Sequence, residues 1–282
     1  MPELPEVETV CRGLNQVTLN YPIRGGQVLL PRSIAHPDSV EKFWQGVTNT
    51  QLTHWFRRGK YLLAALQTAD GQPGGHLGVH LRMTGQMLWL SPTEPVSKHC
   101  RVRFSFGDEH ELRFVDQRTF GRLWWVPADS PLESVISGLA ALGPEPFSDR
   151  FSPDYLYQAT RGRQRPVKNA LLDQALVAGI GNIYADEALF LSRIRPTTLC
   201  ARLGRQRITR LHGAIRDALA AGIAQGGTTF SDFRNVHGIN GNYGGVANVY
   251  DRENAPCRQC QTPIRRIKLA GRSAHFCPQC QR

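Results

Sequence analysis

The sequence predicts an α+β protein of two domains, with β-strands concentrated in the first half of the chain and helices in the second. Three observations support this prediction. The chain has 282 residues, which is enough for two hydrophobic cores. Short apolar, β-prone segments follow one another from residue 27 to residue 126, and no helical pattern separates them. Helical spacing begins near residue 153, and a cluster of four cysteines ends the chain.

The β-prone segments are bounded by turn residues, and several of them alternate between apolar and polar side chains. In Arg101–Phe106, for example, Val102, Phe104 and Phe106 fall on one side of the strand. Such a series predicts a β-sandwich or a barrel-like pair of sheets, and it argues against a doubly wound α/β fold. The expected strands are Gln27–Leu30, Gln51–Phe56, Tyr61–Leu66, His76–Leu81, Gln86–Leu90, Arg101–Phe106, Glu111–Val115 and Leu123–Val126.

A helix is expected over residues 1–17, ahead of the strands. Pro5 suits the first helical position, where a missing N–H costs nothing. Glu6 and Glu8 fall in the first turn, where the helix dipole favours negative charge. The helix is therefore expected to begin inside the protein and not on a frayed tail.

The residue after the initiator methionine is Pro2, and small residues at that position normally allow Met1 to be removed. The α-amine freed by removal of Met1 would be a secondary amine with a pKa of about 8, so that part of it is unprotonated at neutral pH. A secondary amine that attacks an aldehydic carbon forms an iminium ion. Glu3 is close enough to act as an acid or base at the same centre. The alternative is an ordinary acidic helix cap behind a chance proline.

After a Pro-, Ser- and Gly-rich segment, Pro127–Ser152, which we interpret as a linker and hinge, the chain becomes helical. The last expected helix carries arginines on one face, which usually means no more than a solvated surface. The glycine-rich segment Gly226–Gly245 follows, and a long loop of this kind is either functional or disordered. The expected helices are Pro153–Thr160, Val167–Gln174, Tyr184–Ser192 and Leu203–Ala224.

The charge balance points to a polyanionic partner. The chain carries 34 Lys and Arg against 23 Asp and Glu, a net charge of +11, which favours nucleic acid. A basic protein that is merely soluble is the alternative. We find no signal peptide and no apolar run long enough to span a membrane.

The seven cysteines indicate a metal site in a reducing cytosol and not a disulfide framework. Two C-x2-C pairs, Cys257 with Cys260 and Cys277 with Cys280, stand sixteen residues apart. Four thiolates at this spacing predict one closed, structural Zn²⁺ site, with an iron–sulfur centre as the alternative. The intervening Thr262–Phe276 is expected to form a β-hairpin. The remaining cysteines, expected to be inert thiols, are Cys11, Cys100 and Cys200.

The metal-bound hairpin is also a plausible phosphate clamp, because residues 257–282 contain no acidic side chain. Phosphate contacts of this kind position a duplex without reading its sequence. The basic residues of the segment are Arg258, Arg265, Arg266, Lys268, Arg272 and Arg282.

Taken together, these features resemble formamidopyrimidine-DNA glycosylase, the bacterial base-excision enzyme for oxidised purines. The resemblance covers essentially the whole chain. It implies an N-terminal catalytic β-sandwich over residues 1–130, a hinge over 131–152, a helix-two-turn-helix DNA-binding domain with a lesion loop over 153–247, and a zinc finger over 248–282. The blocks that carry it are PELPEVETV at 2–10, RRGKYLL at 57–63, HLRMTG at 80–85, DQRTFG at 116–121, LGPEP at 142–146, GIGNIYADEALF at 179–190, QGGTTFSDF at 225–233 and GRSAHFCPQCQR at 271–282.

The resemblance assigns four catalytic roles. Pro2 matches the family's nucleophile at the damaged sugar, and Glu3 matches its proton donor. Lys60 matches the lysine of the β-elimination step, although a lysine there would otherwise be read as an exposed strand-edge residue. Arg272 matches the arginine of the second elimination.

The resemblance also assigns DNA contacts. Met83, Arg118 and Phe120 match the triad that fills the gap left by an extruded nucleotide. For Met83 and Phe120 the alternative is ordinary core packing. Asn182 lies in a Gly-rich turn that opens a helix, a natural phosphate cradle. The positions that match backbone-binding residues are His99, Arg163, Lys168 and Asn182.

Two departures from the family pattern bear on specificity. Thr119 stands where some relatives have a second basic residue, so the contact with the orphaned base is expected to be weaker. The loop Thr228–Gly245 covers the extruded base in the family and is variable, and its Phe230 and Ser231 do not decide which base is preferred.

The resemblance implies a bifunctional glycosylase and abasic-site lyase, a cytoplasmic monomer that acts on damaged double-stranded DNA and has no contact with membranes. The first alternative is the sister group that acts on oxidised pyrimidines and is related to endonuclease eight. Leu4 argues against that group, which usually carries glycine there. The second alternative is a zinc-ribbon DNA-binding protein without catalysis.

Overall fold

The computed structural model describes residues 1–19, 21–229 and 233–282, and the chain divides into two compact units. The first unit is Met1–Ala140 with Gln225–Asn242, and the second is Ala141–Ala224 with Tyr243–Arg282. Gln225–Asn242 thus belongs to the first unit although it follows the last helix of the second. The domain boundaries expected from the sequence stay a prediction.

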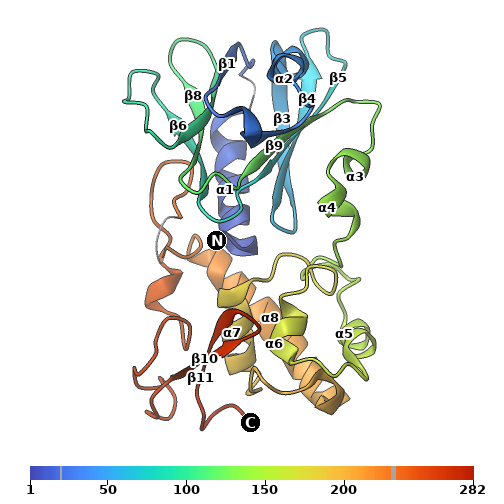
Figure 1. The fold of residues 1–282 in the computed structure, drawn as a ribbon, viewed down its shortest axis with the longest axis vertical. Helices are drawn as coiled ribbons and strands as arrows, with labels where there is room; N and C mark the ends of the chain where they lie inside the picture. Colours follow the sequence, from blue (N-terminus) through green and yellow to red (C-terminus); the bar gives the residue numbers. More distant parts are fainter. Residues whose placement is uncertain (20, 230–232) are drawn as a thin grey trace. The chain divides into compact units, whose positions relative to one another are not determined.

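The first unit is a β-sandwich, as predicted (Figure 1). One sheet is antiparallel and has the order β1-β7-β8-β6. The other has the order β2-β9-β5-β4-β3 and is antiparallel except where β2 pairs with β9. The strands are β1 (Gly25–Val28), β2 (Ile34–His36), β3 (Thr50–Arg58), β4 (Tyr61–Thr68), β5 (Pro73–His80), β6 (Gly85–Leu90), β7 (Cys100–Ser105), β8 (Glu111–Asp116) and β9 (Arg122–Val126).

The two sheets and helix α1 (Leu4–Val17) share one hydrophobic core. Alternate residues of β7, such as Val102 and Phe104, are fully buried in it, as the apolar–polar alternation predicted. Val10 and Leu14 bring α1 into the same core. The helix begins at Leu4, with Glu3 as its N-cap, so the expectation that Pro5 opens it is wrong by one position.

The expectation that no helix interrupts the strands is also wrong, because α2 (Val40–Val47) lies between β2 and β3. Its N-cap Ser39 accepts a hydrogen bond from the Lys42 backbone, and Phe43 is fully buried. Two helical turns are too short for apolar periodicity to show. The region expected to be linker contains two short helices, α3 (Leu132–Val135) and α4 (Ser137–Ala140).

The second unit is helical and ends in a β-hairpin. The long helix α8 buries one stripe, including Ile208, Leu211 and Ile215, which is the spacing of an amphipathic helix. No helix among the described residues is long and apolar enough to cross a membrane. The helices are α5 (Pro153–Thr160), α6 (Val167–Leu171), α7 (Asn182–Leu191) and α8 (Arg205–Ala224), and the hairpin strands are β10 (Arg265–Leu269) and β11 (Arg272–Phe276).

Candidate active site and metal centre

The first turn of α1 is buried and its backbone is fixed by a carboxylate. Pro2 is buried and Glu3 is 2% exposed. The Glu3 N–H donates to Glu6 Oε2 at 2.8 Å, in a capping box that closes the start of the helix. Glu6 Oε1 accepts a second hydrogen bond from the Thr228 N–H, also at 2.8 Å. The predicted nucleophile and proton donor therefore sit on an ordered helix start, as expected.

Lys60 lies in the two-residue turn between β3 and β4, and it is only 7% exposed. Gly59, with φ at +56°, adopts the left-handed conformation that this tight turn requires. Because the lysine is buried, the alternative of an ordinary exposed strand-edge residue is wrong.

An ion pair ties α1 to the turn that carries Lys60. Arg57 Nε lies 3.0 Å from Glu8 Oε2, and Arg57 Nη1 donates to the Gly59 carbonyl at 3.1 Å. Burial raises the pKa of Glu8, but hydrogen bonds and charge attraction from Arg12 and Arg57 outweigh it and hold the pKa below its ordinary range. Glu8 is thus charged at neutral pH and links the two segments that bear the predicted catalytic residues of the first unit.

His80, at the end of β5, is a buried residue for which the sequence predicted no role. Its Nδ1 accepts a hydrogen bond from the Arg82 N–H at 3.0 Å, which fixes the turn leading to Met83. Burial lowers the pKa of His80 to about 3, and the charges of Arg82 and Lys60 act in the same direction. The imidazole is therefore neutral, which suits an acceptor. The block HLRMTG contained this residue, but nothing in it indicated burial.

We predict that His80 makes the first unit sensitive to acid. The folded-state pKa lies below the unfolded value, so the stabilisation is complete above pH ~6.5 and is lost as the pH falls toward 3. Between pH 6.5 and 4.5 the wild type should lose up to about 3 kcal/mol more unfolding free energy than His80→Asn, which keeps an acceptor. Denaturant unfolding followed by tryptophan fluorescence reports this unit, because Trp44, Trp55, Trp89, Trp124 and Trp125 all lie in it. Parallel pH profiles for the two proteins would contradict the assignment.

The predicted insertion residues lie on two loops of the first unit. Met83 is half-buried, whereas Phe120 is 49% exposed. The Arg118 guanidinium lies 5.1 Å from the centre of the Phe120 ring, a cation–π distance. An aromatic ring this exposed is not core packing, so that alternative is wrong for Phe120.

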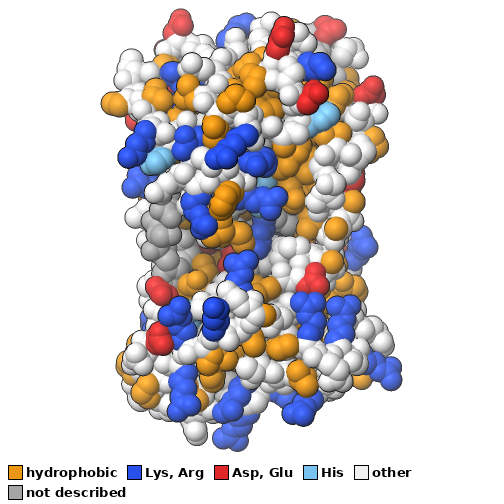
Figure 2. Space-filling model, in the orientation of Figure 1, with side chains coloured by type: hydrophobic (Ala, Val, Ile, Leu, Met, Phe, Trp, Pro, Cys, Tyr) orange, Lys and Arg blue, Asp and Glu red, His pale blue; other side chains and the backbone are white. Residues whose placement is uncertain are grey.

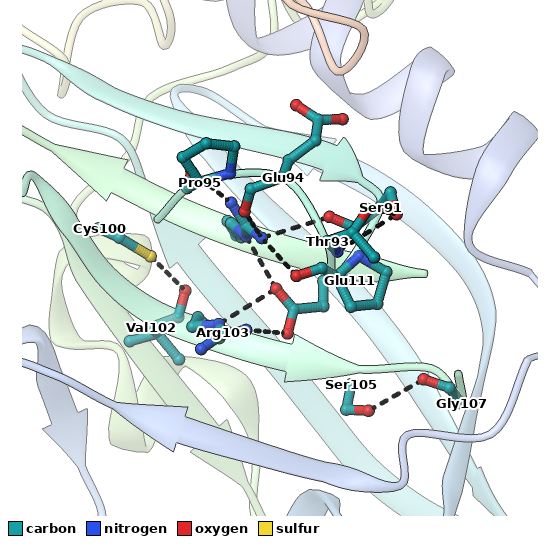
Figure 3. Close-up of polar contacts among 12 residues, drawn as sticks. Ser91, Thr93, Glu94, Pro95, Cys100, Val102, Arg103, Ser105, Gly107 and Glu111 are labelled. Atoms are coloured by element: carbon teal, nitrogen blue, oxygen red, sulfur yellow. Dashed lines mark hydrogen bonds and ion pairs between the residues drawn. The ribbon is translucent and has the colours of Figure 1, made fainter. Parts of the chain in front are cut away.

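Glu111 and the buried Arg113 hold the loop that precedes His99; Figure 3 labels Glu111, its second partner Arg103 and the loop residues Ser91, Glu94 and Pro95. Arg113 is 1% exposed; its Nε donates to Glu111 Oε2 at 2.8 Å, and its Nη atoms donate to carbonyls of the loop at 2.9–3.5 Å. Arg103 donates to both oxygens of the same carboxylate. Burial raises the pKa of Glu111, but the hydrogen bonds from Arg103 and Arg113 outweigh it and lower the pKa. The carbonyls belong to Ser91, Pro92, Glu94 and Pro95.

In the second unit, the predicted phosphate contact Arg163 and the predicted catalytic residue Arg272 are both exposed. Arg272 opens β11 and lines a groove of about 380 Å³ with Arg266 and Lys268. Asn182 is the first residue of α7, and its Nδ2 donates to Ser273 Oγ at 3.2 Å. Lys and Arg side chains also appear on the visible surface of each unit (Figure 2).

Lys168 differs from these exposed residues, since it is 1% exposed. Its Nζ lies 2.6 Å from Asp186 Oδ1 and also donates to the Ser273 carbonyl. The buried Asp186 carboxylate in turn accepts from the His275 backbone at 2.9 Å. Contact with the DNA backbone stays a prediction for Lys168, and we expect any effect of this residue on DNA to act through Ser273.

The four C-terminal cysteines fit a metal ion. Their Sγ atoms all lie within 4.8 Å of one another, with 3.9 Å between Cys257 and Cys280 and 3.4 Å between Cys260 and Cys277. A tetrahedral Zn²⁺ with bonds of about 2.3 Å requires sulfur–sulfur distances of about 3.8 Å. The Cys280 N–H points at Cys277 Sγ at 3.4 Å, as in a metal-binding knuckle. This set can hold one zinc ion with no position left for substrate, so the ion is structural.

Cys277→Ala is expected to lose zinc and DNA binding together, because three thiolates cannot close the site and the basic hairpin β10–β11 depends on it. The β-sandwich should stay folded, which the tryptophan signal of the first unit would show. Cys200→Ala is the matched control, since Cys200 is a buried thiol of the second unit outside the cluster. Metal analysis giving full zinc in Cys277→Ala would contradict the assigned ligands.

A β-sandwich whose first helix is preceded by a buried Pro2-Glu3 pair, followed by a helical unit that ends in a four-cysteine hairpin, is the arrangement that the sequence resemblance implies for DNA glycosylases of base excision repair. Three family models match the chain: the formamidopyrimidine-DNA glycosylase N-terminal domain at residues 1–123, its H2TH domain at 142–234, and a zinc finger found in FPG and IleRS at 255–282. The chain belongs to the formamidopyrimidine-DNA glycosylase family.

Individual relatives agree with this assignment. A formamidopyrimidine-DNA glycosylase of Acaryochloris marina is 60% identical over 281 residues, covering 100% of this chain and 99% of the relative. The MutM (FPG) protein of Thermus thermophilus is 38% identical, with a TM-score of 0.86 and coverage of 99% and 98%. The Lactococcus lactis FPG mutant G226P in complex with Fapy-dG-containing DNA is 32% identical, with a TM-score of 0.89 and full coverage of both chains. Other complexes of the Lactococcus protein contain abasic-site DNA or oxidised-pyrimidine DNA.

Proposed function

We propose that this protein is a bifunctional DNA glycosylase and abasic-site lyase that removes oxidised purines, 8-oxoguanine and formamidopyrimidines, from duplex DNA through a Schiff base at Pro2. The observation that carries the proposal is the ordered helix start, where Pro2 is buried beside Glu3 and the Glu6 carboxylate fixes the backbone. An amine held in this way can meet a sugar carbon in one orientation, which lowers the entropic cost of attack.

The chemistry follows from the residue types. Once Met1 is removed, the Pro2 amine attacks C1′ of a nucleotide that has been flipped out of the stack. The base leaves with the electrons of the C1′–N bond, and Glu3 donates the proton needed as the sugar ring opens. The resulting iminium acidifies the C2′ proton, and loss of that proton expels the 3′ phosphate. Lys60 assists this β-elimination, and Arg272 assists the second elimination at the 5′ side.

The DNA contacts follow the same assignment. Met83 and Phe120 fill the gap left by the flipped nucleotide, and Arg118 hydrogen-bonds the orphaned base. The exposed Phe120 ring with Arg118 stacked near it supports this role. The phosphate backbone is held by His99, Arg163 and Asn182, and the buried Lys168 acts on it through Ser273.

The choice of purine lesions rests on sequence features. Leu4 and the Arg118–Phe120 block fit the purine group better than its pyrimidine-specific sister. A relative solved with oxidised-pyrimidine DNA as well as Fapy-dG DNA keeps the pyrimidine alternative open to test. Residues 230–232 of the expected lesion loop, including Phe230 and Ser231, lie outside the described residues.

We further propose that the enzyme acts as a monomer in the bacterial cytosol, away from membranes.

Borohydride reduction in the presence of an 8-oxoguanine duplex tests the proposal. Reduction of the iminium should leave a covalent protein–DNA adduct, and peptide mapping should place it at Pro2. An unmodified duplex of the same sequence is the control, and a duplex with an oxidised pyrimidine ranks the two lesion classes. A mature protein that keeps Met1 and yields no adduct would favour the non-catalytic DNA-binding alternative.

A further inference from the structure

Asp116, the last residue of β8, is a buried carboxylate with no part in the proposed chemistry. Its Oδ1 accepts the Thr84 hydroxyl at 2.5 Å, and its Oδ2 accepts the Gly121 N–H at 2.7 Å. Thr84 Oγ1 in turn accepts the Arg118 N–H at 3.0 Å. One carboxylate and one hydroxyl thus join two separate loops, and Asp116 and Thr84 are 1% and 8% exposed.

The backbone of Asp116 extends the same connection to a third segment. Its N–H donates to the His99 carbonyl at 2.9 Å, and its carbonyl accepts from Arg101 Nε at 2.8 Å. Arg101 Nη2 lies 3.3 Å from Nδ1 of the His99 ring. The loop of the predicted phosphate contact His99 therefore meets the two insertion loops at a single residue.

The residues that are hydrogen-bonded to the Asp116 carboxylate stand next to the predicted insertion residues in the sequence. Thr84 follows Met83, and Gly121 follows Phe120. Both loops contain a non-glycine residue in the left-handed region, Arg82 at φ +53° and Thr119 at φ +59°. Such conformations persist only where surrounding contacts hold them. The exposed Phe120 ring adds little packing, so hydrogen bonds hold both loops. The Arg82 N–H donates to His80, and Thr119 accepts from Arg32 and Arg122. The buried hydrogen bonds of Asp116 and Thr84 are those that join the two loops to each other.

We propose that Asp116 and Thr84 are positioning residues that hold Met83, Arg118 and Phe120 as one rigid insertion element. The inference rests on the proposed function, because it takes the insertion role of those three residues as given. An insertion element that is already ordered in the free protein loses little conformational freedom when it enters the duplex. Arg118, whose own N–H is fixed by Thr84, is then aimed at the base opposite the lesion, and the network sets discrimination between opposite bases.

Thr84→Val tests this proposal, because valine keeps the shape and removes the hydroxyl, and Thr84→Ser is the matched rescue. Single-turnover excision is measured on 8-oxoguanine opposite C and opposite A, with 2-aminopurine beside the lesion to report unstacking. Thr84→Val should lose roughly tenfold in excision rate, the size expected when a buried hydrogen-bonding group is left unpaired. Its C-to-A rate ratio should move toward one, and its 2-aminopurine signal should fall. Thr84→Ser should match the wild type, and affinity for undamaged duplex should be unchanged in both.

Wild-type ratios and fluorescence in a folded Thr84→Val would overturn the proposal. If that variant does not fold, Asp116→Asn gives the same readout, because its amide retains only one acceptor oxygen for two donors. Arg118→Ala separates this inference from the proposed function. If Arg118→Ala leaves the rate ratio unchanged, the insertion role itself fails. If Arg118→Ala shifts the ratio and the Thr84 and Asp116 variants do not, the positioning role alone fails.

Discussion

Glu3→Gln is expected to lose base excision while it retains appreciable strand cleavage at a preformed abasic site. A positioned general acid typically contributes about 10²–10⁴-fold, so excision of 8-oxoguanine should fall by that factor. An abasic site has no base to expel, and its aldehyde is already available to the Pro2 amine. The proton donated by Glu3 is then not needed, and cleavage should fall far less.

The structure indicates that this substitution leaves the hydrogen bonds at the start of α1 in place. The capping box uses the backbone N–H of Glu3, which donates to Glu6, and the Glu3 side chain, which accepts from the Glu6 backbone. Glutamine keeps the N–H and a side-chain acceptor oxygen, so the start of the helix should be kept. The assay is a gel with two labelled duplexes, one carrying 8-oxoguanine and one an abasic site. Glu41→Gln is the matched control, since Glu41 is also in a first helical turn of this unit but is exposed. If Glu3→Gln lost the same factor in cleavage rate on both substrates, the proposed division of roles between Pro2 and Glu3 would be contradicted.

The features that could be predicted from the sequence are those determined by a small number of residues that lie close together in the chain. Two C-x2-C pairs fix the ligands of a metal site by their spacing alone, and the four Sγ atoms do lie together. Helix α5 (Pro153–Thr160) was predicted to the residue, and the structure shows that local residues set its start, since Ser152 caps it and Pro153 opens it. Eight of the nine described strands of the sandwich were predicted to within a few residues, and β2 (Ile34–His36) was missed. Burial alternates along β7, as its sequence pattern predicted, whereas β8 is buried at nearly every position.

The contacts that could not be predicted join residues far apart in the chain. The Glu6 carboxylate, which caps the start of α1 locally, accepts a second hydrogen bond from the Thr228 N–H, 222 positions away, and no local pattern indicates that bond. Lysine is almost always exposed, so the burial of Lys60 and Lys168 follows only from their surroundings in the fold. Lys168 is buried because Asp186, on a different helix, compensates its charge.

Pro2→Gly is expected to weaken both base excision and abasic-site cleavage, with excision losing more. Glycine keeps a primary amine, which still forms an imine with an aldehyde, and it still permits removal of Met1. However, glycine lacks the ring that fixes the orientation of the terminal amine about the N–Cα bond, and it loses more conformational freedom when it is held in one place. A misplacement of about 1 Å can cost about 10²-fold in rate, so excision should fall by at least that factor.

A chain with one alanine inserted between Met1 and Pro2 separates the amine from its position. In that variant Pro2 becomes an internal amide that cannot form an iminium, and the new terminal amine is displaced by about one residue length, roughly 3.5 Å. Both activities and the borohydride adduct should then be lost, whereas zinc content and affinity for undamaged duplex stay unchanged. The measurement is adduct yield on abasic DNA for wild type, Pro2→Gly and the insertion variant, and the expected order is wild type, then Pro2→Gly, then none. An insertion variant that is trapped as well as the wild type would place the nucleophile elsewhere in the chain, with Lys60 as the first amine to examine.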